Sequence, residues 1–269
     1  MDRAKLLNAA LSPVDGALGL VMDGLDRTGA LNVASGLAMG GMRAALRRLF
    51  QFQNDLRIEG AEHVPREGGV LFASNHQSWL DAQVIGAASP RLVHFVAKRE
   101  LGEWPLVRHA IRLTGSVLVQ RGGGGQDALA DAIALLRRGE ALAIFPEGTI
   151  PGEEEIPRSA VDPLTRLLPG KTGVARLALA AGVPIVPVGL SGTGLSLPPE
   201  VYPRLELLRP PARTPIRIRF GAPISMAEYA ERTQDRELWR EVTERVMEAI
   251  APLVDHRLDF VPPVQAEAA

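Results

Sequence analysis

The amino-acid sequence predicts an α/β fold: a mainly parallel mixed sheet flanked by helices, with a pair of helices at the N-terminus. Two observations support this prediction. From residue 53 onward, short apolar runs alternate with amphipathic segments, an order typical of parallel strands joined by crossover helices. The composition agrees, because 46% apolar and 23% charged residues are typical of a chain that buries a core.

The predicted strands are short apolar runs bounded by turn residues: 56–59, 69–73, 92–97, 116–119, 141–145, 183–190 and 216–220. The predicted helices are 80–87, 104–113, 127–138, 174–181 and most of 226–254. Gly139 and Gly182 are expected to end the helices that precede them, because glycine readily adopts the left-handed conformation of helix C-termini. Pro184 and Pro187 each remove a backbone donor, so strand 183–190 is expected to be bulged or at an edge of the sheet.

The N-terminal fifty residues differ from the rest. Two apolar-rich segments, roughly 4–25 and 31–50, predict an amphipathic helical pair, with Arg43, Arg47 and Arg48 near its end. Either this pair packs on the core, or it anchors the protein to a membrane surface with its apolar side in lipid. Residues 51–261 are then the α/β domain, within which 150–170 form a surface loop or a lid. Residues 262–269 are expected to be disordered.

Composition and charge exclude several function classes. With no cysteine in 269 residues, disulfides, thiolate catalysis and cysteine-ligated zinc are excluded. The formal net charge of −1 gives no overall field that attracts nucleic acid, so no nucleic-acid partner is expected. No run of about 18 apolar residues occurs, so a membrane-spanning helix is not expected. Acidic residues interrupt the first apolar stretch, which argues against a signal peptide.

Reactive side chains follow four of the predicted strands. His76, Lys98, Arg121 and Glu147 each stand at or just after the end of one strand. In open α/β sheets, ligands bind beyond the carboxyl ends of the strands. The sequence therefore predicts one site at this edge of the sheet, built from several strand ends.

His76 and Asp81 are the strongest candidates for catalysis. Histidine is the side chain best suited to accept a proton near neutral pH, and a carboxylate on its other ring nitrogen would fix the tautomer. Five residues on one helix turn through about 500°, which leaves the two side chains roughly 140° apart. We therefore expect His76 on the loop and Asp81 just inside the following helix.

Rival chemistries fail on particular residues. A serine hydrolase needs G-x-S-x-G, but the nearest match, residues 189–193, has Thr193 in the last position. Ser78 is two residues from His76, too close in sequence to be its nucleophile. The glycines 122–125 and the stretch 170–172 do not complete a phosphate-binding loop. His76, His94, His109 and Asp81 match no ligand spacing of a known metal site, so no metal is expected.

Four stretches together resemble a known family. They are Asn-His-Gln-Ser-Trp-Leu-Asp at 75–81, Gly-Ser-Val-Leu-Val-Gln-Arg at 115–121, Phe-Pro-Glu-Gly-Thr at 145–149 and Val-Pro-Ile-Val-Pro-Val at 183–188. Their order and spacing resemble those of the glycerolipid acyltransferases, in the 1-acylglycerol-3-phosphate acyltransferase branch. The resemblance covers about residues 53–222 and implies the fold of that family.

The resemblance implies transfer of a fatty acyl group from coenzyme A or acyl carrier protein to the free hydroxyl of a lysophospholipid. The acyl thioester is a substrate, and no cofactor is implied. The partners are lysophospholipid, acyl thioester, acyl carrier protein where that is the donor, and the membrane surface. The implied location is cytoplasmic, peripheral (monotopic) on the inner face of the cell membrane.

Site residues follow from the same resemblance. His76 resembles the general base of the family and Asp81 the carboxylate that orients it. Substrate binding is implied for residues in or beside the blocks: Asn75, Lys98, Arg121, Glu147, Gly148, Thr149, Lys171 and Pro187. The attack itself needs neither an acyl-enzyme nor a metal. Backbone N–H groups around Gly148, or in the helix after Ser78, are the candidate donors to the developing oxyanion.

Two positions depart from the family pattern. Arg usually follows the Thr of the third block, and this chain has Ile150, which cannot replace a bidentate guanidinium. Either Arg158, Arg166 or Lys171 takes over the acceptor phosphate, or the acceptor is a lysolipid without that phosphate, such as a lyso-aminolipid or glycolipid. Gln120 stands where Asp is common, with no physical consequence that we can derive. A non-catalytic membrane-binding protein on the same fold is the third reading.

Overall fold

The computed structural model describes residues 12–13, 15–23, 30–98, 109, 111, 116–119, 125–150, 167–198 and 212–258. For residues 30–38, 97–98, 119 and 125–127 it describes only the backbone. Most of the predicted helix 104–113, most of 150–170 and the tail 262–269 lie outside these ranges.

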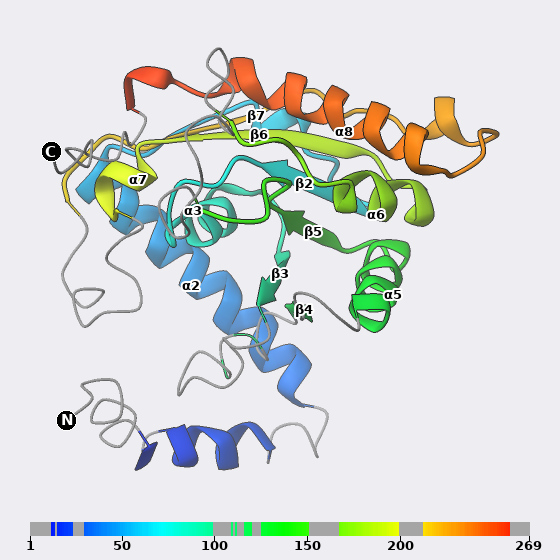
Figure 1. The fold of residues 1–269 in the computed structure, drawn as a ribbon. Coiled ribbons are helices and arrows are strands. Elements are labelled where there is room, and N and C mark those ends of the chain that lie inside the picture. Colours follow the sequence, from blue (N-terminus) through cyan, green and yellow to red (C-terminus); the bar gives the residue numbers. More distant parts are fainter. Residues whose placement is uncertain are drawn as a thin grey trace, which may run out of the picture.

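The described residues contain a seven-stranded sheet with strand order β1-β7-β6-β2-β5-β3-β4 (Figure 1). The strands are β1 Arg57–Glu59, β2 Val70–Ser74, β3 Val93–Lys98, β4 Val117–Val119, β5 Ala141–Ile144, β6 Ile185–Ser191 and β7 Arg217–Phe220. Every neighbouring pair is parallel except β6 and β7, which are antiparallel. The mainly parallel mixed sheet predicted from the sequence is therefore confirmed.

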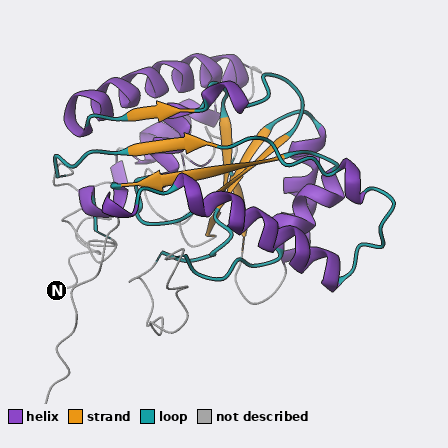
Figure 2. Ribbon diagram, turned by 90° about the horizontal axis from the view of Figure 1, so that it is seen from above, coloured by secondary structure: helices purple, strands orange, loops and turns teal. Residues whose placement is uncertain are grey.

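Helices cover both faces of the sheet (Figure 2). They are α2 Ala30–Asn54, α3 Asp81–Ala88, α5 Gly125–Arg137, α6 Gly173–Ala181, α7 Thr193–Ser196 and α8 Arg236–Ile250, with short 3-10 helices at Ala61–His63, Ala227–Tyr229, Ala251–Leu253 and His256–Leu258. Helices α5, α6 and α8 pack in one hydrophobic cluster, and α2 and α3 pack in the other. The sheet is thus the middle of three layers.

Strand β2 shows why the central strands have continuous apolar sequences. All five of its residues are buried, with Leu71 and Ala73 in the α5/α6/α8 cluster and Val70 and Phe72 in the α2/α3 cluster. Alternate side chains of a strand point to opposite faces, so a parallel strand covered on both faces is apolar at every position. Truncating Phe72 to alanine is expected to cost about 3–5 kcal/mol of stability.

Strand β6 has one of the two arrangements that its prolines predicted. Despite its prolines β6 is not at an edge, because it lies between β2 and β7. The bulge alternative is the one observed: Gly221 N–H donates to Pro187 O, and the next pairing joins Ile185 to Ile224. One residue of β6 therefore faces two of the opposite segment, at the point where Pro187 has no N–H to donate.

The N-terminal helical pair is present. Residues 15–23 are helical, and α2 runs four residues beyond the predicted end at 50. Arg43 of α2 donates to the backbone oxygens of Gly86 and Ser89, at the negative end of the α3 dipole. Phe50 is buried in the α2/α3 cluster, so the end of α2 is part of the core. Among the described helices, none is long and apolar enough to span a membrane.

The segment 226–254 is mostly helical, as predicted. Within 226–254 the long helix α8 begins only at Arg236, because Asp235 caps it by accepting from the N–H groups of Glu237 and Leu238. Gly139 and Gly182 have φ of 89° and 68°, so both end the preceding helices in the left-handed conformation, as predicted.

Candidate active site

His76 and Asp81 are in direct contact. Nδ1 of His76 lies 2.7 Å from Oδ2 of Asp81. His76 stands on the loop after β2, and Asp81 is the first residue of α3, as the spacing predicted. An ionised carboxylate only accepts hydrogen bonds, so Nδ1 carries the hydrogen and Nε2 has the free lone pair. The imidazole is thereby held in the tautomer that a general base requires.

Asp81 organises the whole turn. Its Oδ2 also accepts from the N–H groups of Gln77 at 2.6 Å and Ser78 at 2.9 Å, and its side chain is fully buried. The positive end of the α3 dipole favours this anion. The His76 side chain is 17% exposed, so the pair consists of a buried carboxylate and an accessible imidazole.

Two further groups hold His76 from the turn after β5. The Phe145 ring stacks on the imidazole, with centroids 3.8 Å apart and planes 9° apart. The backbone N–H of His76 donates to Oε1 of Glu147 at 2.9 Å. Because β2 and β5 are parallel neighbours, their carboxyl ends bring these two turns together.

Glu147 is a buried carboxyl that joins three segments. It is 3% exposed, and its Oε2 accepts from the N–H of Leu168 at 2.9 Å. Burial, with a smaller contribution from the charge of Asp81, raises the pKa of Glu147 to about 7, against the opposing effect of the two backbone N–H groups. Both of its oxygens are engaged by the backbone, so a direct substrate contact stays a prediction.

Asn75 braces the loop against the end of β6, and Ser78 braces it against the residue that follows α7. The Asn75 amide donates to Leu190 O at 2.9 Å and accepts from Leu190 N at 2.7 Å. The Ser78 hydroxyl donates to Leu197 O at 2.7 Å, which is inconsistent with a nucleophile. The substrate role implied for Asn75 is untested, and the contacts observed are internal.

The three residues after Glu147, which are Gly148, Thr149 and Ile150, differ in their surroundings. Gly148 has φ of 73°, and a Cβ there would lie 2.7 Å from Nζ of Lys171, so the exposed lysine side chain lies across this glycine. Gly148 N–H already donates to Phe145 O, so its own N–H is engaged, and the other backbone donors expected around it or after Ser78 stay predictions. Thr149 is 7% exposed, and its hydroxyl bonds to no described residue. Ile150 is 1% exposed.

The remaining predicted residues are placed as follows. Lys98 ends β3, which pairs with β5 and β4, but its side chain is not among those described. Arg121 lies outside the described residues. Pro187 is a buried residue of β6 opposite Ala73 of β2, and its ring packs against Gly221. Of the four strand-end side chains, the structure therefore shows His76 and Glu147 brought together.

The other histidines have partners of their own. His94 Nε2 lies 3.7 Å from Glu140, and His109 Nε2 lies 3.0 Å from Asp15 of the N-terminal helix. The three histidines that could be grouped with Asp81 thus contact three different carboxylates. Within the described ranges, no group of three or more potential ligands could hold a metal ion.

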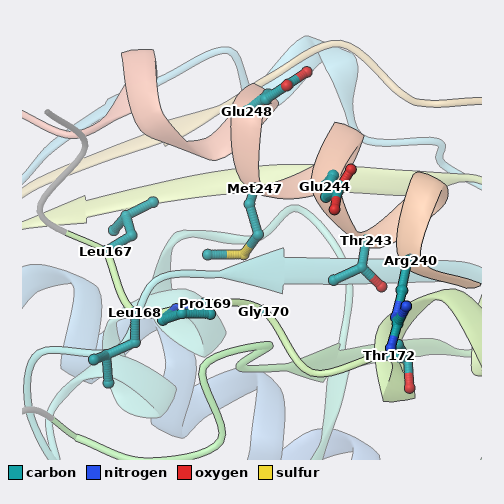
Figure 3. Close-up of a pocket in the computed structure, with 10 residues that line it drawn as sticks. All are labelled: Leu167, Leu168, Pro169, Gly170, Thr172, Arg240, Thr243, Glu244, Met247 and Glu248. Atoms are coloured by element: carbon teal, nitrogen blue, oxygen red, sulfur yellow. The ribbon is translucent and has the colours of Figure 1, made fainter. Parts of the chain in front are cut away.

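A cavity of about 340 Å³ lies between the segment 167–172 and α8 (Figure 3). Its apolar lining comes from Leu167, Leu168 and Met247, and Arg240 and Glu244 contribute charge. The same Leu168 donates its N–H to Glu147, so the wall of this cavity is one hydrogen bond from the turn that holds His76.

Sequence reasoning missed Phe145 and Leu168 as parts of the site. Phe145 directly precedes Pro146 and Glu147, but no local pattern predicts that its ring stacks on a residue 69 positions earlier. Leu168 contributes only its backbone N–H, which carries no side-chain signal.

Comparisons with known proteins agree with this geometry. A family model described as Acyltransferase matches residues 55–191. The chain is 24% identical over 216 residues to the 1-acyl-sn-glycerol-3-phosphate acyltransferase of Bacillus subtilis, covering 80% of this chain and 96% of that protein. It is 33% identical over 138 residues to the lyso-ornithine lipid O-acyltransferase of Pseudomonas aeruginosa, covering 51% of this chain and 47% of that protein.

A solved structure shows the same fold. The crystal structure of the 1-acyl-sn-glycerophosphate (LPA) acyltransferase PlsC from Thermotoga maritima matches with a TM-score of 0.61 at 23% identity, covering 93% of this chain and 96% of that chain. The family match spans the strands and turns that carry His76, Asp81 and Glu147. The chain therefore belongs to the acyltransferase family, in its PlsC-like glycerolipid branch, and is an acyltransferase.

Proposed function

We propose that this protein transfers a fatty acyl group from a thioester to the free hydroxyl of a lysophospholipid, with 1-acylglycerol-3-phosphate as acceptor and phosphatidic acid as product. The observation that carries the proposal is the accessible His76 imidazole bonded to the buried Asp81 carboxylate. This arrangement supplies a base to an alcohol, which is a poor nucleophile at neutral pH.

In the proposed step, Nε2 of His76 removes the hydroxyl proton as the acceptor oxygen attacks the thioester carbonyl carbon. The C–S bond then breaks, and the imidazolium returns the proton to the departing thiolate. The products are the new ester and a free thiol, so protons and charge balance. Asp81 stabilises the imidazolium while it exists. A well-placed general base contributes roughly 10²–10⁴-fold to the rate.

The acyl donor is acyl-CoA or acyl carrier protein, and we propose no cofactor besides this substrate. No metal is needed, because the base and the anion-stabilising donors are protein groups. Lys98, Arg121 and Lys171 are proposed to face the anionic parts of the substrates. Of these, Lys171 is the one whose side chain the structure describes, and it lies across Gly148 beside Glu147.

Ile150 favours a second acceptor class. Its side chain is 1% exposed and offers nothing to a phosphate at the position where the resemblance implies Arg. One relative in the comparisons is named a lyso-ornithine lipid O-acyltransferase. The alternative acceptor is accordingly a lysolipid without a terminal phosphate, a lyso-aminolipid or a glycolipid.

We further propose that the protein works in the cytoplasm at the inner face of the cell membrane, without spanning it. In the described part of the chain, five of the six large apolar side chains that stay exposed lie on the N-terminal helices: Leu20 77%, Val21 59%, Met42 45%, Leu49 49% and Phe52 83%. Met42, Leu49 and Phe52 are seven and three residues apart, so they share one side of α2. Exposed Arg48, four residues before Phe52, borders this side and suits lipid phosphates.

The test is release of free thiol from acyl-CoA or acyl carrier protein, with lysophosphatidate, lyso-ornithine lipid and other lysolipids as acceptors. Turnover with lysophosphatidate supports the first acceptor class, and turnover only with the others supports the second. His76→Gln should abolish turnover, whereas His94→Gln, which changes a histidine paired with Glu140 outside the site, should not. Full activity in His76→Gln, or no turnover with any donor and acceptor, rejects the proposal.

A further inference from the structure

The ring of Phe145 stacks on the imidazole of His76. The two rings are nearly parallel, 9° apart, at a centroid distance of 3.8 Å. We propose that Phe145 is a positioning residue for the general base: its ring fixes the plane of the imidazole and stabilises the imidazolium formed during the reaction. This inference rests on the proposed role of His76.

The hydrogen bond to Asp81 does not fix the imidazole completely. It restrains one atom, Nδ1, while the ring can still tilt about the line from Nδ1 to the carboxylate oxygen. Such a tilt moves Nε2 out of line with the attacking hydroxyl. A flat surface at contact distance prevents this tilt, because the ring would have to leave its stacked position. Asp81 and Phe145 together therefore define where the lone pair of Nε2 points.

Phe145 is itself held independently of His76. Its backbone oxygen accepts from Gly148 N–H at 3.0 Å, which closes the turn after β5. Its side chain is partly buried against the cluster formed with α2 and α3. In the same turn Glu147 holds the backbone of His76. One short turn thus restrains the main chain and the ring plane of the base.

The contact is stronger in the transition state than before it. The imidazole is neutral when it meets the hydroxyl and positively charged once it has taken the proton. An aromatic face has negative electrostatic potential and attracts a nearby cation. An interaction that strengthens only as charge develops raises kcat and leaves substrate affinity unchanged. A leucine at 145 can fill the space but has no such face.

Steady-state kinetics of matched variants test the role. Phe145→Leu is expected to lower kcat about 3- to 30-fold, the range of cation–π contributions, with KM for the acceptor unchanged within about twofold. Phe145→Tyr should restore kcat because it keeps the ring. Phe95→Leu is the control, since Phe95 packs against the same cluster but not against His76. An unchanged kcat in Phe145→Leu, or an equal loss in Phe145→Tyr and Phe145→Leu, overturns the inference.

Nuclear magnetic resonance tests the contact without activity. Protons of a ring stacked on phenylalanine are shifted upfield, so the His76 ring signals, assigned with His76→Gln, should lie upfield of those of a histidine in a short unstructured peptide. They should move downfield in Phe145→Leu but not in Phe95→Leu. His76 signals at ordinary positions in the unsubstituted protein overturn the inference even where Phe145→Leu does not fold. Thiol release by His76→Gln judges the proposed function separately.

Discussion

The carboxylate of Glu147 accepts a hydrogen bond from the backbone N–H of His76, 71 residues earlier in the chain, at 2.9 Å. With the second bond, from Leu168 N–H, this buried carboxyl joins the loop after β2, the turn after β5 and the wall of the cavity under α8.

Replacement of Glu147 by Gln should change how stability depends on pH. Since burial raises the pKa of Glu147 to about 7 from 4.5, its stabilising contribution is present below about pH 4.5 and is lost as the pH rises through 7. The stability of Glu147→Gln relative to the unsubstituted protein should therefore increase over this window, by on the order of 3 kcal/mol at about 1.4 kcal/mol per pKa unit. Denaturant unfolding at several pH values measures it, and parallel curves for the two proteins contradict it.

Replacement of Asp81 by Asn should impair turnover more than folding. The neutral amide can still accept from the loop N–H groups, but it cannot stabilise an imidazolium, so kcat should fall by about 10²-fold or more. Thiol release with acyl-CoA measures kcat, and Glu140→Gln, which alters the carboxylate paired with His94, is the control. Equal losses in the two variants would show that the Asp81 effect is not specific to the base.

Replacement of Ile150 by Arg tests the acceptor class. If the natural acceptor lacks a terminal phosphate, the guanidinium should raise turnover with lysophosphatidate relative to lyso-ornithine lipid by about tenfold, the effect of roughly 1.4 kcal/mol of charge-assisted hydrogen bonding. Because Ile150 is 1% exposed, the melting temperature should fall. Ile150→Met is the volume-matched control. A folded Ile150→Arg protein with an unchanged ratio rejects this reasoning.

Replacement of Lys171 by Met should weaken binding of an anionic acceptor. The change keeps the apolar stem that covers Gly148 and removes the ammonium, so KM for lysophosphatidate should rise about 5- to 10-fold with kcat nearly unchanged. Arg138→Gln, which changes an exposed arginine just after α5, is the control. If KM stays constant in Lys171→Met, the prediction is wrong and other cationic residues bind the phosphate of the acceptor.

Replacement of Phe52 by Ser should reduce membrane association. Phe52 is 83% exposed on α2, and burying such a ring in lipid contributes about 2 kcal/mol, or roughly 30-fold in partitioning. Flotation with anionic liposomes measures the bound fraction. Leu92→Ser is the control, because Leu92 is 40% exposed but lies just before β3. Deleting residues 1–50 is a poorer test, since Phe50 and Arg43 pack on the rest of the protein.

Much of the fold could be predicted because it depends on short, local sequence patterns. The run 69–73 is apolar at every position since β2 is buried on both faces, and Gly139 and Gly182 mark helix ends through their own conformational freedom. The contact between His76 and Asp81 was also predictable, because five residues around one loop-to-helix turn leave few arrangements. These features depend on neighbours in the chain.

What only the tertiary structure decided depends on which strands are adjacent. The place of β6 inside the sheet could not be predicted. Pro187 has no N–H to donate to a neighbouring strand, and it is accommodated there by a bulge in a segment more than thirty residues later. The stack of Phe145 on His76 and the bonds of Glu147 exist because β2 and β5 are parallel neighbours. Local sequence determined which side chains stand at strand ends, and strand order, set by burial of the whole sheet, determined which of them meet.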